Sequence, residues 1–209
     1  MTRTIGSNGE RTLRSLREAG LKRLYKQGFA GTTLRELASD VGVQAGSLYN
    51  YFENKQDFLF QLMDYVMDTL TEATDQRLAF AKSQHDALMI YVDCHVRYHC
   101  EKKREVLIST TELRSLTPIN YEKIIGKRDQ YEQRLKDILA KGNEKGEWVI
   151  SEPNIASKVI LGMMTSVGIW YRSDGSFDLN SLVGFYQEMV DNLVSGSLDM
   201  NSMSLSQAH

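Results

Sequence analysis

The spacing of hydrophobic residues predicts helices nearly throughout the chain. The clearest stripe recurs every three or four positions and comprises Leu59, Leu62, Met63, Val66, Met67 and Leu70. This period places the six side chains on one side of an α-helix. Further helices are expected over residues 10–27, 33–42, 44–51, 84–102, 106–116, 118–142, 153–171 and 179–195, and no segment alternates as a strand does. The pattern predicts an all-α fold.

Capping residues, glycines and prolines mark the ends of several predicted helices. Thr33, with a glutamate three positions later, has the pattern of a capping box, in which hydroxyl and carboxylate each accept a backbone N–H. Gly42 can adopt the positive φ that ends a helix. Pro118 and Pro153 fall at first-turn positions, where a missing N–H costs nothing. Residues 196–209 are rich in Ser, Met and Asn without periodicity, and we expect a disordered tail.

The short helices over residues 33–42 and 44–51 have the features of a helix-turn-helix. Ala38 and Gly42 are small enough for two steeply crossing helices to approach closely. The second helix is polar and aromatic on its outer side, which carries Gln44, Ala45, Ser47, Tyr49, Asn50 and Tyr51. Such amides and hydroxyls can contact base edges and phosphates in a duplex groove.

Charge is unevenly distributed along the chain. The net charge is -2, but residues 1–55 hold nine Lys/Arg against five Asp/Glu, so this segment is +4 and the remainder is -6. A basic segment attached to an acidic remainder favours binding of a polyanion, such as DNA, at one end of the molecule. The same excess of basic residues is also typical of a solvated helix face. Lys55 begins a helix, where the dipole disfavours a cation unless an anion such as phosphate also binds there.

The motifs GTTLRELA (31–38), VGV (41–43) and GSLYNYFENK (46–55) resemble the DNA-binding signature of the TetR (tetracycline-repressor) family. The resemblance covers about the first 65 residues and departs from the family pattern at Gly20 and at Gln44-Ala45. It implies a helix-turn-helix DNA-binding domain over 1–55 and a helical ligand-binding and dimerisation domain over 56–195. It further implies phosphate contacts from Thr33, Tyr49, Tyr51 and Lys55, and contacts with bases or nearby sugar-phosphate from Gln44, Ala45, Ser47 and Asn50. The alternative for the tyrosines is packing within the small helical domain.

The family resemblance also implies a homodimer formed through the last two long helices. The apolar stripes over residues 153–171 and 179–195 fit a two-fold four-helix bundle, although both helices could instead lie in the core of one chain. A dimer suits a palindromic operator, because one short helix reads only a few base pairs.

The expected effector is a small molecule bound in the C-terminal domain. Candidate contacts combine soft apolar, aromatic and cationic side chains: Met63, Met67, Tyr98, Leu113, Arg114, Tyr121, Arg128, Tyr131, Met164, Val167 and Trp170. Residues 113–118, 127–132, 160–163 and 168–175 resemble the branch of the family that senses acyl-CoA thioesters. Arg114, Arg128 and Arg172 are the candidates to bind the CoA phosphates. Each candidate could equally be an ordinary core residue or ion-pair partner.

Two other functions stay open: regulation of efflux or stress genes through a promiscuous pocket, and a helical ligand-binding scaffold that does not regulate DNA. In the proposed regulator, ligand binding would tilt the helix that runs from Lys55 to Met63 and Met67, and so respace the two DNA-binding domains.

Other chemistry is not expected. His95 and His99 have the i, i+4 spacing of metal ligands. However, the nearby cysteines diverge in direction and the glutamate of an H-E-x-x-H site is absent, and we expect no metal or cofactor. Cys94 and Cys100 point to different sides of one helix and cannot easily form a disulfide. No nucleophile with its base, signal peptide or membrane-spanning segment is evident. A non-enzymatic, cytoplasmic protein is expected.

Overall fold

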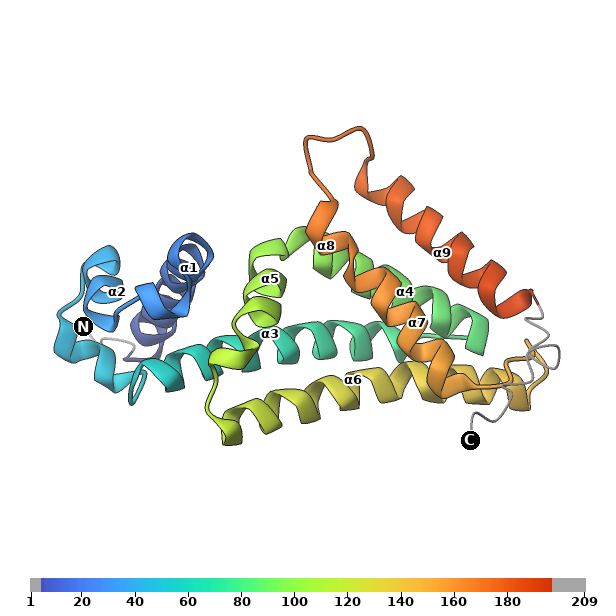
Figure 1. Cartoon of the computed structure of the whole chain (residues 1–209), viewed down its shortest axis with the longest axis horizontal. Helices are drawn as coiled ribbons and strands as arrows, with labels where there is room; N and C mark the ends of the chain where they lie inside the picture. Colours follow the sequence, from blue (N-terminus) through green and yellow to red (C-terminus); the bar gives the residue numbers. More distant parts are fainter. Residues whose placement is uncertain (1–4, 197–209) are drawn as a thin grey trace, which may run out of the picture. The chain divides into compact units, whose positions relative to one another are not determined.

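All regular structure in the described residues is helical, which confirms the all-α fold (Figure 1). The computed structural model describes the backbone of residues 5–196, with side chains from residue 9 onward. In chain order the elements are α1 (Ile5–Gly31), α2 (Leu34–Val41), the 3₁₀-helix η1 (Ala45–Asn50), α3 (Lys55–Leu78), α4 (Gln84–Glu101), α5 (Lys103–Thr111), the 3₁₀-helix η2 (Leu113–Ser115), α6 (Pro118–Glu144), α7 (Pro153–Thr165), α8 (Val167–Trp170) and α9 (Leu179–Ser195). The predicted disordered tail lies outside the described residues, apart from Gly196.

The observed helices differ from the predicted ones in several places, three of which are breaks in a helix. Gly28 interrupts α1 with a φ of 69°, but helical turns resume as far as Gly31. The helix predicted over 106–116 ends at Thr111 and is followed by the separate turn η2. The helix predicted over 153–171 is divided at Ser166 into α7 and α8.

The chain forms two compact units, and α3 and α6 each contribute residues to both. Among the described residues, unit 1 comprises residues 5–69 and 102–127, and unit 2 comprises residues 70–101 and 128–196. Unit 1 therefore contains α1, α2 and η1 together with α5, η2 and the first part of α6. The domain boundary expected at residue 55 was inferred from the helix-turn-helix motif alone, and it stays a prediction.

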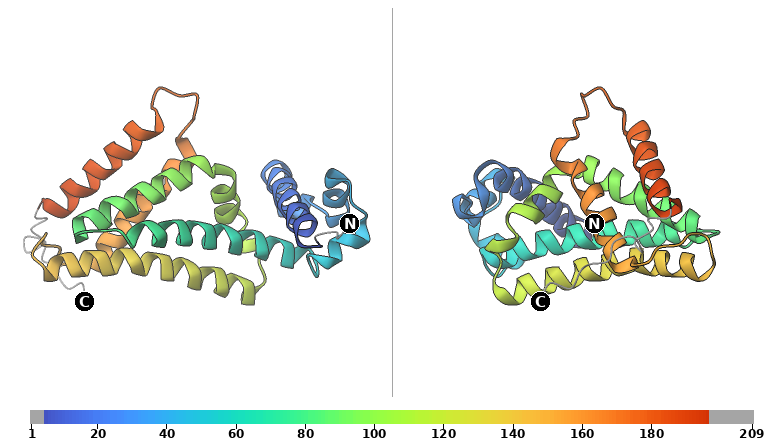
Figure 2. Two further views of the ribbon diagram at one scale, coloured as in Figure 1. Left: turned by 180° about the vertical axis from the view of Figure 1, so that it is seen from behind. Right: turned by 45° about the vertical axis from the view of Figure 1, so that its right-hand side comes forward.

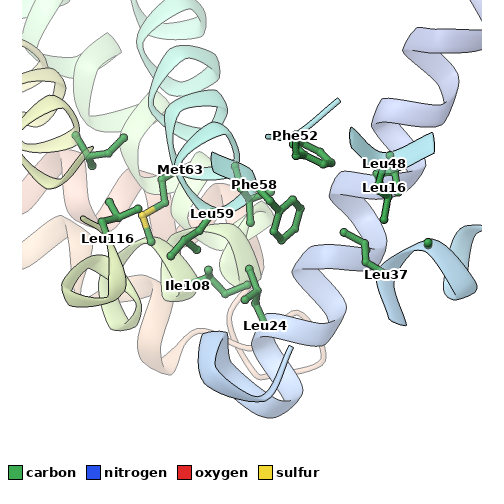
Figure 3. Close-up of a cluster of buried hydrophobic side chains, with 13 residues drawn as sticks. Leu16, Leu24, Leu37, Leu48, Phe52, Phe58, Leu59, Met63, Ile108 and Leu116 are labelled. Carbon is green, nitrogen blue, oxygen red and sulfur yellow. The ribbon is translucent and has the colours of Figure 1, made fainter. Parts of the chain in front are cut away.

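One hydrophobic cluster joins the elements of unit 1 (Figure 3). It includes Leu16 and Leu24 from α1, Leu37 and Ala38 from α2, Leu48 from η1, Phe52, the α3 residues Phe58, Leu59, Leu62 and Met63, and Ile108, Leu116 and Ile124 from the segment 102–127. Phe52 and Phe58 pack edge to face with ring centroids 5.0 Å apart. A Cβ on Gly20 would lie 2.1 Å from Cζ of Phe58, so any larger residue would force the buried Phe58 ring to move. The family departure at Gly20 thus has a packing reason.

Unit 2 is organised around α4, which packs against α7, α8 and α9 (Figure 2). Its buried residues include Leu88, Tyr91, Val92 and Val96. Nε1–H of Trp148 donates to the Leu139 carbonyl at 2.9 Å. None of the helices in the described part of the chain is both long enough and apolar enough to cross a membrane.

Candidate DNA-binding surface

Local hydrogen bonds set the start and the end of α2. The Thr33 hydroxyl accepts the Glu36 N–H at 3.2 Å, while Oε2 of Glu36 accepts the Thr33 N–H at 3.0 Å. Gly42 follows the helix in the left-handed conformation, with φ 71° and ψ 29°. The predicted capping box is confirmed, and the turn that leads into η1 has a defined geometry.

Charged contacts hold α2 against α1 within unit 1. The Arg23 guanidinium donates to both carboxylate oxygens of Asp40, and its Nη1 lies 3.3 Å from Oε1 of Glu36. The hydrogen bond from Arg23 lowers the pKa of Asp40. Both acids are exposed to solvent or half-buried, so these bonds fix orientation more than they add stability.

Helix η1 presents a largely exposed surface. It is a 3₁₀-helix, tighter than an α-helix, and the Ser47 N–H donates to the Gln44 carbonyl at 2.9 Å. Leu48 is its buried residue and holds η1 in the hydrophobic cluster. Around it Ser47 is half-buried, whereas the exposed residues are Gln44, Ala45, Gly46, Tyr49 (64% exposed) and Asn50. We call Gln44, Ala45, Ser47, Tyr49 and Asn50 the η1 surface.

The polar side chains of the η1 surface have no internal hydrogen-bond partner in the described part of the chain. This holds for Gln44, Ser47, Tyr49 and Asn50, whose amides and hydroxyls are available to an external partner. Tyr51 is different, because it is half-buried and its ring centroid lies 6.4 Å from that of Phe52. The arrangement can offer donors and acceptors to a duplex groove.

Thr33 and Lys55, both predicted phosphate contacts, make internal contacts in this structure. The Thr33 hydroxyl takes part in the capping box and also donates to Oε2 of Glu36 at 2.8 Å. Lys55 is half-buried; its Nζ donates to the Ala30 carbonyl at 3.3 Å and lies 4.2 Å from the Phe29 ring centroid. The position of Lys55 at a helix N-terminus therefore has an internal explanation that the sequence did not reveal. Its phosphate contact stays a prediction.

The eleven candidate effector contacts fall in both units. In unit 1, Met63 and Met67 are buried, Leu113 and Tyr121 are half-buried against the hydrophobic cluster, and Arg114 is exposed. In unit 2, Tyr131, Met164 and Val167 are buried, Tyr98 and Arg128 are half-buried, and Trp170 is 48% exposed. Their assignment to one ligand site stays a prediction.

Unit 2 also contains a buried polar network that sequence reasoning considered only as a metal site. His95 lies between the hydroxyls of Tyr131 (3.4 Å) and Thr165 (3.2 Å), and its ring stacks on His99 with centroids 3.9 Å apart. Nδ1 of His99 carries its proton, because it is 2.8 Å from the His95 carbonyl. Burial lowers the pKa of His99 to about 4 and that of His95 well below its usual value. Both imidazoles are therefore neutral at pH 7.

Two protein-family models match the chain. The model for "Tetracyclin repressor-like, C-terminal domain" matches residues 81–194, more than half of the chain. The model for "Bacterial regulatory proteins, tetR family" matches residues 16–62, which include the η1 surface.

Known relatives and solved structures are similar to this chain over most of its length. The chain is 25% identical over 183 residues to the fatty acid metabolism regulator protein of Bacillus subtilis (strain 168), covering 86% of this chain and 92% of the relative. The crystal structure of a tetR-family regulatory protein from Rhodococcus RHA1 is 21% identical, with a TM-score of 0.80 over 88% of this chain and 97% of that one. The structure of AibR in complex with isovaleryl coenzyme A and operator DNA is also 21% identical, with a TM-score of 0.77 over 86% and 97% of the two chains.

Proposed function

The chain belongs to the TetR family of ligand-responsive, DNA-binding transcriptional regulators, and we propose that it binds its operator through the η1 surface. In this proposal Gln44, Ala45, Ser47 and Asn50 face bases or nearby sugar-phosphate, while Thr33, Tyr49, Tyr51 and Lys55 contact phosphates. Two copies of η1, one from each subunit, would enter successive major grooves about one helical turn apart on a palindrome. The regulator would act as a repressor that its effector releases.

The exposure of η1 is the observation that carries this proposal. Tyr49 is 64% exposed, and the polar side chains of the η1 surface have no internal partner in the described residues. An amide such as that of Asn50 can pair with adenine through two hydrogen bonds. Removing a polar group from water costs little free energy if new hydrogen bonds replace those that it made to water. Base edges and phosphates would supply such hydrogen bonds.

Substitutions in the η1 surface test this proposal directly. We would select duplexes from a random pool with the purified protein and measure affinity by fluorescence anisotropy at several salt concentrations. Asn50→Ala should weaken binding by roughly 1–3 kcal/mol and relax the preference at one base pair. Tyr49→Ala should weaken binding to all duplexes alike. Tyr25→Ala, at another exposed tyrosine of unit 1, is the matched control. Equal affinities of Asn50→Ala, Tyr49→Ala and wild type would refute the proposal.

Dimerisation through α7 and α9 is the second part of the proposal. The stripes on these helices divide into two faces: Ile160, Met164, Leu182, Tyr186 and Val190 are buried within the chain, whereas Ile155, Val159, Phe185 and Met189 are between 40% and 59% exposed. Single exposed hydrophobic residues are normal on a protein surface, but here two lie one turn apart on each of two helices, which favours a protein interface. A second copy of the same face would cover it with two-fold symmetry. Sedimentation of the purified protein tests this.

We further propose that the effector is an acyl-CoA thioester. The support comes from two relatives, one named a regulator of fatty acid metabolism and one solved with isovaleryl coenzyme A. Arg114, Arg128 and Arg172 are half-buried or exposed and could bind the CoA phosphates. Isovaleryl-CoA and longer acyl-CoAs should release the selected duplex, whereas free CoA and the free acids should not. If no acyl-CoA released the duplex but aromatic cations did, the result would favour a regulator of efflux or stress genes.

A further inference from the structure

A carboxylate from the segment between α5 and α6 binds the turn before α2. Oε1 of Glu112 accepts the backbone N–H of Phe29 at 3.1 Å, although the two residues are 83 positions apart. The neighbouring Gly28 has a φ of +69°, and a Cβ placed on it would lie 3.1 Å from the same oxygen. The kink in α1 therefore brings the Phe29 N–H to this acceptor. An ionised acceptor gives a stronger hydrogen bond than a neutral one.

Gln56 binds the same segment from the first turn of α3. Its Nε2 donates to the Ser115 carbonyl at 2.7 Å, and its Oε1 accepts the Thr117 N–H at 3.1 Å. The Ser115 hydroxyl in turn donates to Oε2 of Glu112 at 2.8 Å. Three hydrogen bonds of Glu112 and Gln56 thus connect residues 112–117 to two separate places in unit 1, and the fourth, between Ser115 and Glu112, orients the carboxylate within that segment. We call this pair of side chains the 56/112 clasp.

The two places that the clasp holds are the two ends of the DNA-binding element. The turn at Phe29 leads directly into α2, because the Phe29 carbonyl accepts the Thr32 N–H at 3.2 Å and the Gly28 carbonyl accepts the Thr32 hydroxyl at 2.9 Å. Gln56 lies on the first turn of α3, a few residues after η1 ends at Asn50. The chain between these ends contains α2, the turn and the η1 surface. A displacement of residues 112–117 would therefore act on both ends at once.

We propose that Glu112 and Gln56 are positioning residues for DNA binding, and that the clasp couples the η1 surface to residues 112–117. This inference rests on the proposed DNA-binding role of η1. By linkage, the coupling operates in both directions: operator DNA bound at η1 restricts residues 112–117, and disorder of 112–117 weakens operator binding. The apolar contacts of Leu116 in the hydrophobic cluster do not require these hydrogen bonds. Loss of the clasp therefore changes the coupling more than the fold.

The first test needs no DNA. Amide hydrogen exchange of the full chain is measured by NMR for wild type, Glu112→Ala, Glu112→Gln and the control Glu122→Ala, whose side chain is exposed on α6. We expect Phe29 to exchange roughly tenfold faster in Glu112→Ala, since a hydrogen bond to a charged group is lost. Glu112→Gln keeps an acceptor for the Phe29 N–H and a donor for Ser115, and it should restore most of the protection. Unchanged Phe29 exchange in Glu112→Ala would overturn the clasp.

The second test adds the selected duplex as the probe. In wild type, DNA should slow exchange at Thr117, which is remote in sequence from η1. In the double variant Glu112→Ala with Gln56→Ala, DNA should still slow exchange around η1 but no longer at Thr117, and operator affinity should fall about tenfold. Persistent slowing at Thr117 in the double variant would refute the coupling. If no duplex bound wild type, the proposed function would fail, while the exchange of Phe29 would still decide whether the clasp forms.

Discussion

Replacing Phe185 by serine should dissociate the dimer without unfolding the subunit. Phe185 lies on α9, and 59% of its surface is exposed. An aromatic side chain buries roughly 200 Å² of surface when it is fully covered. Covering the exposed part of Phe185 in the dimer would therefore bury about 120 Å² more in each subunit. At about 25 cal/mol per Å² this amounts to about 3 kcal/mol per subunit. A two-fold interface contains the residue twice, so the dimer loses up to about 6 kcal/mol.

A loss of about 6 kcal/mol raises the dissociation constant (Kd) of the dimer by about 10⁴-fold. If the dimer covers only half of the exposed Phe185 surface, the substitution still raises the Kd by about 100-fold. Analytical ultracentrifugation across a dilution series measures this change. Phe80→Ser is the matched control, because Phe80 is 80% exposed in unit 2 outside α7 and α9. Circular dichroism should show the same helix content in all three proteins. A Kd within threefold of wild type for Phe185→Ser, or a monomeric wild type at micromolar concentration, would refute the interface.

Three further predictions concern the stability of single units. Gly20→Ala should lower the free energy of unfolding by about 1–3 kcal/mol in urea titrations, because the new Cβ would lie 2.1 Å from the Phe58 ring; equal midpoints would contradict this packing. Thr33→Ala should cost about 1 kcal/mol through loss of the capping box, whereas Thr33→Ser should keep most of it; a serine variant as weak as the alanine one would argue against the cap. Burial lowers the pKa of His99 to about 4 in the folded protein, whereas the unfolded chain takes up this proton at the ordinary pKa of about 6.5. The free energy of unfolding should therefore fall by about 3 kcal/mol as the pH drops from about 6.5 towards 4. The same acid titration of His99→Leu should show a smaller loss, and an identical pH dependence would refute the assignment.

Local sequence patterns determined much of this protein. Helix α9 has the predicted bounds, 179–195, and the cap at Thr33 and the left-handed Gly42 match their predictions. The exposed polar face of η1 could also be predicted, because one short helix shows its burial pattern within six residues. These features depend on interactions between residues a few positions apart. Such interactions are the same wherever the segment lies in the fold.

Features that depend on distant partners were decided only by the tertiary structure. Lys55 contacts the Ala30 carbonyl 25 positions away, and Glu112 binds the Phe29 N–H 83 positions away, so no local pattern indicates either contact. Periodicity placed Val159 and Ile160 on one apolar helix, but packing leaves Val159 exposed and buries Ile160 completely. The physical reason is that a helical period specifies which residues share a face, whereas the elements that cover each face come from elsewhere in the chain or from another subunit.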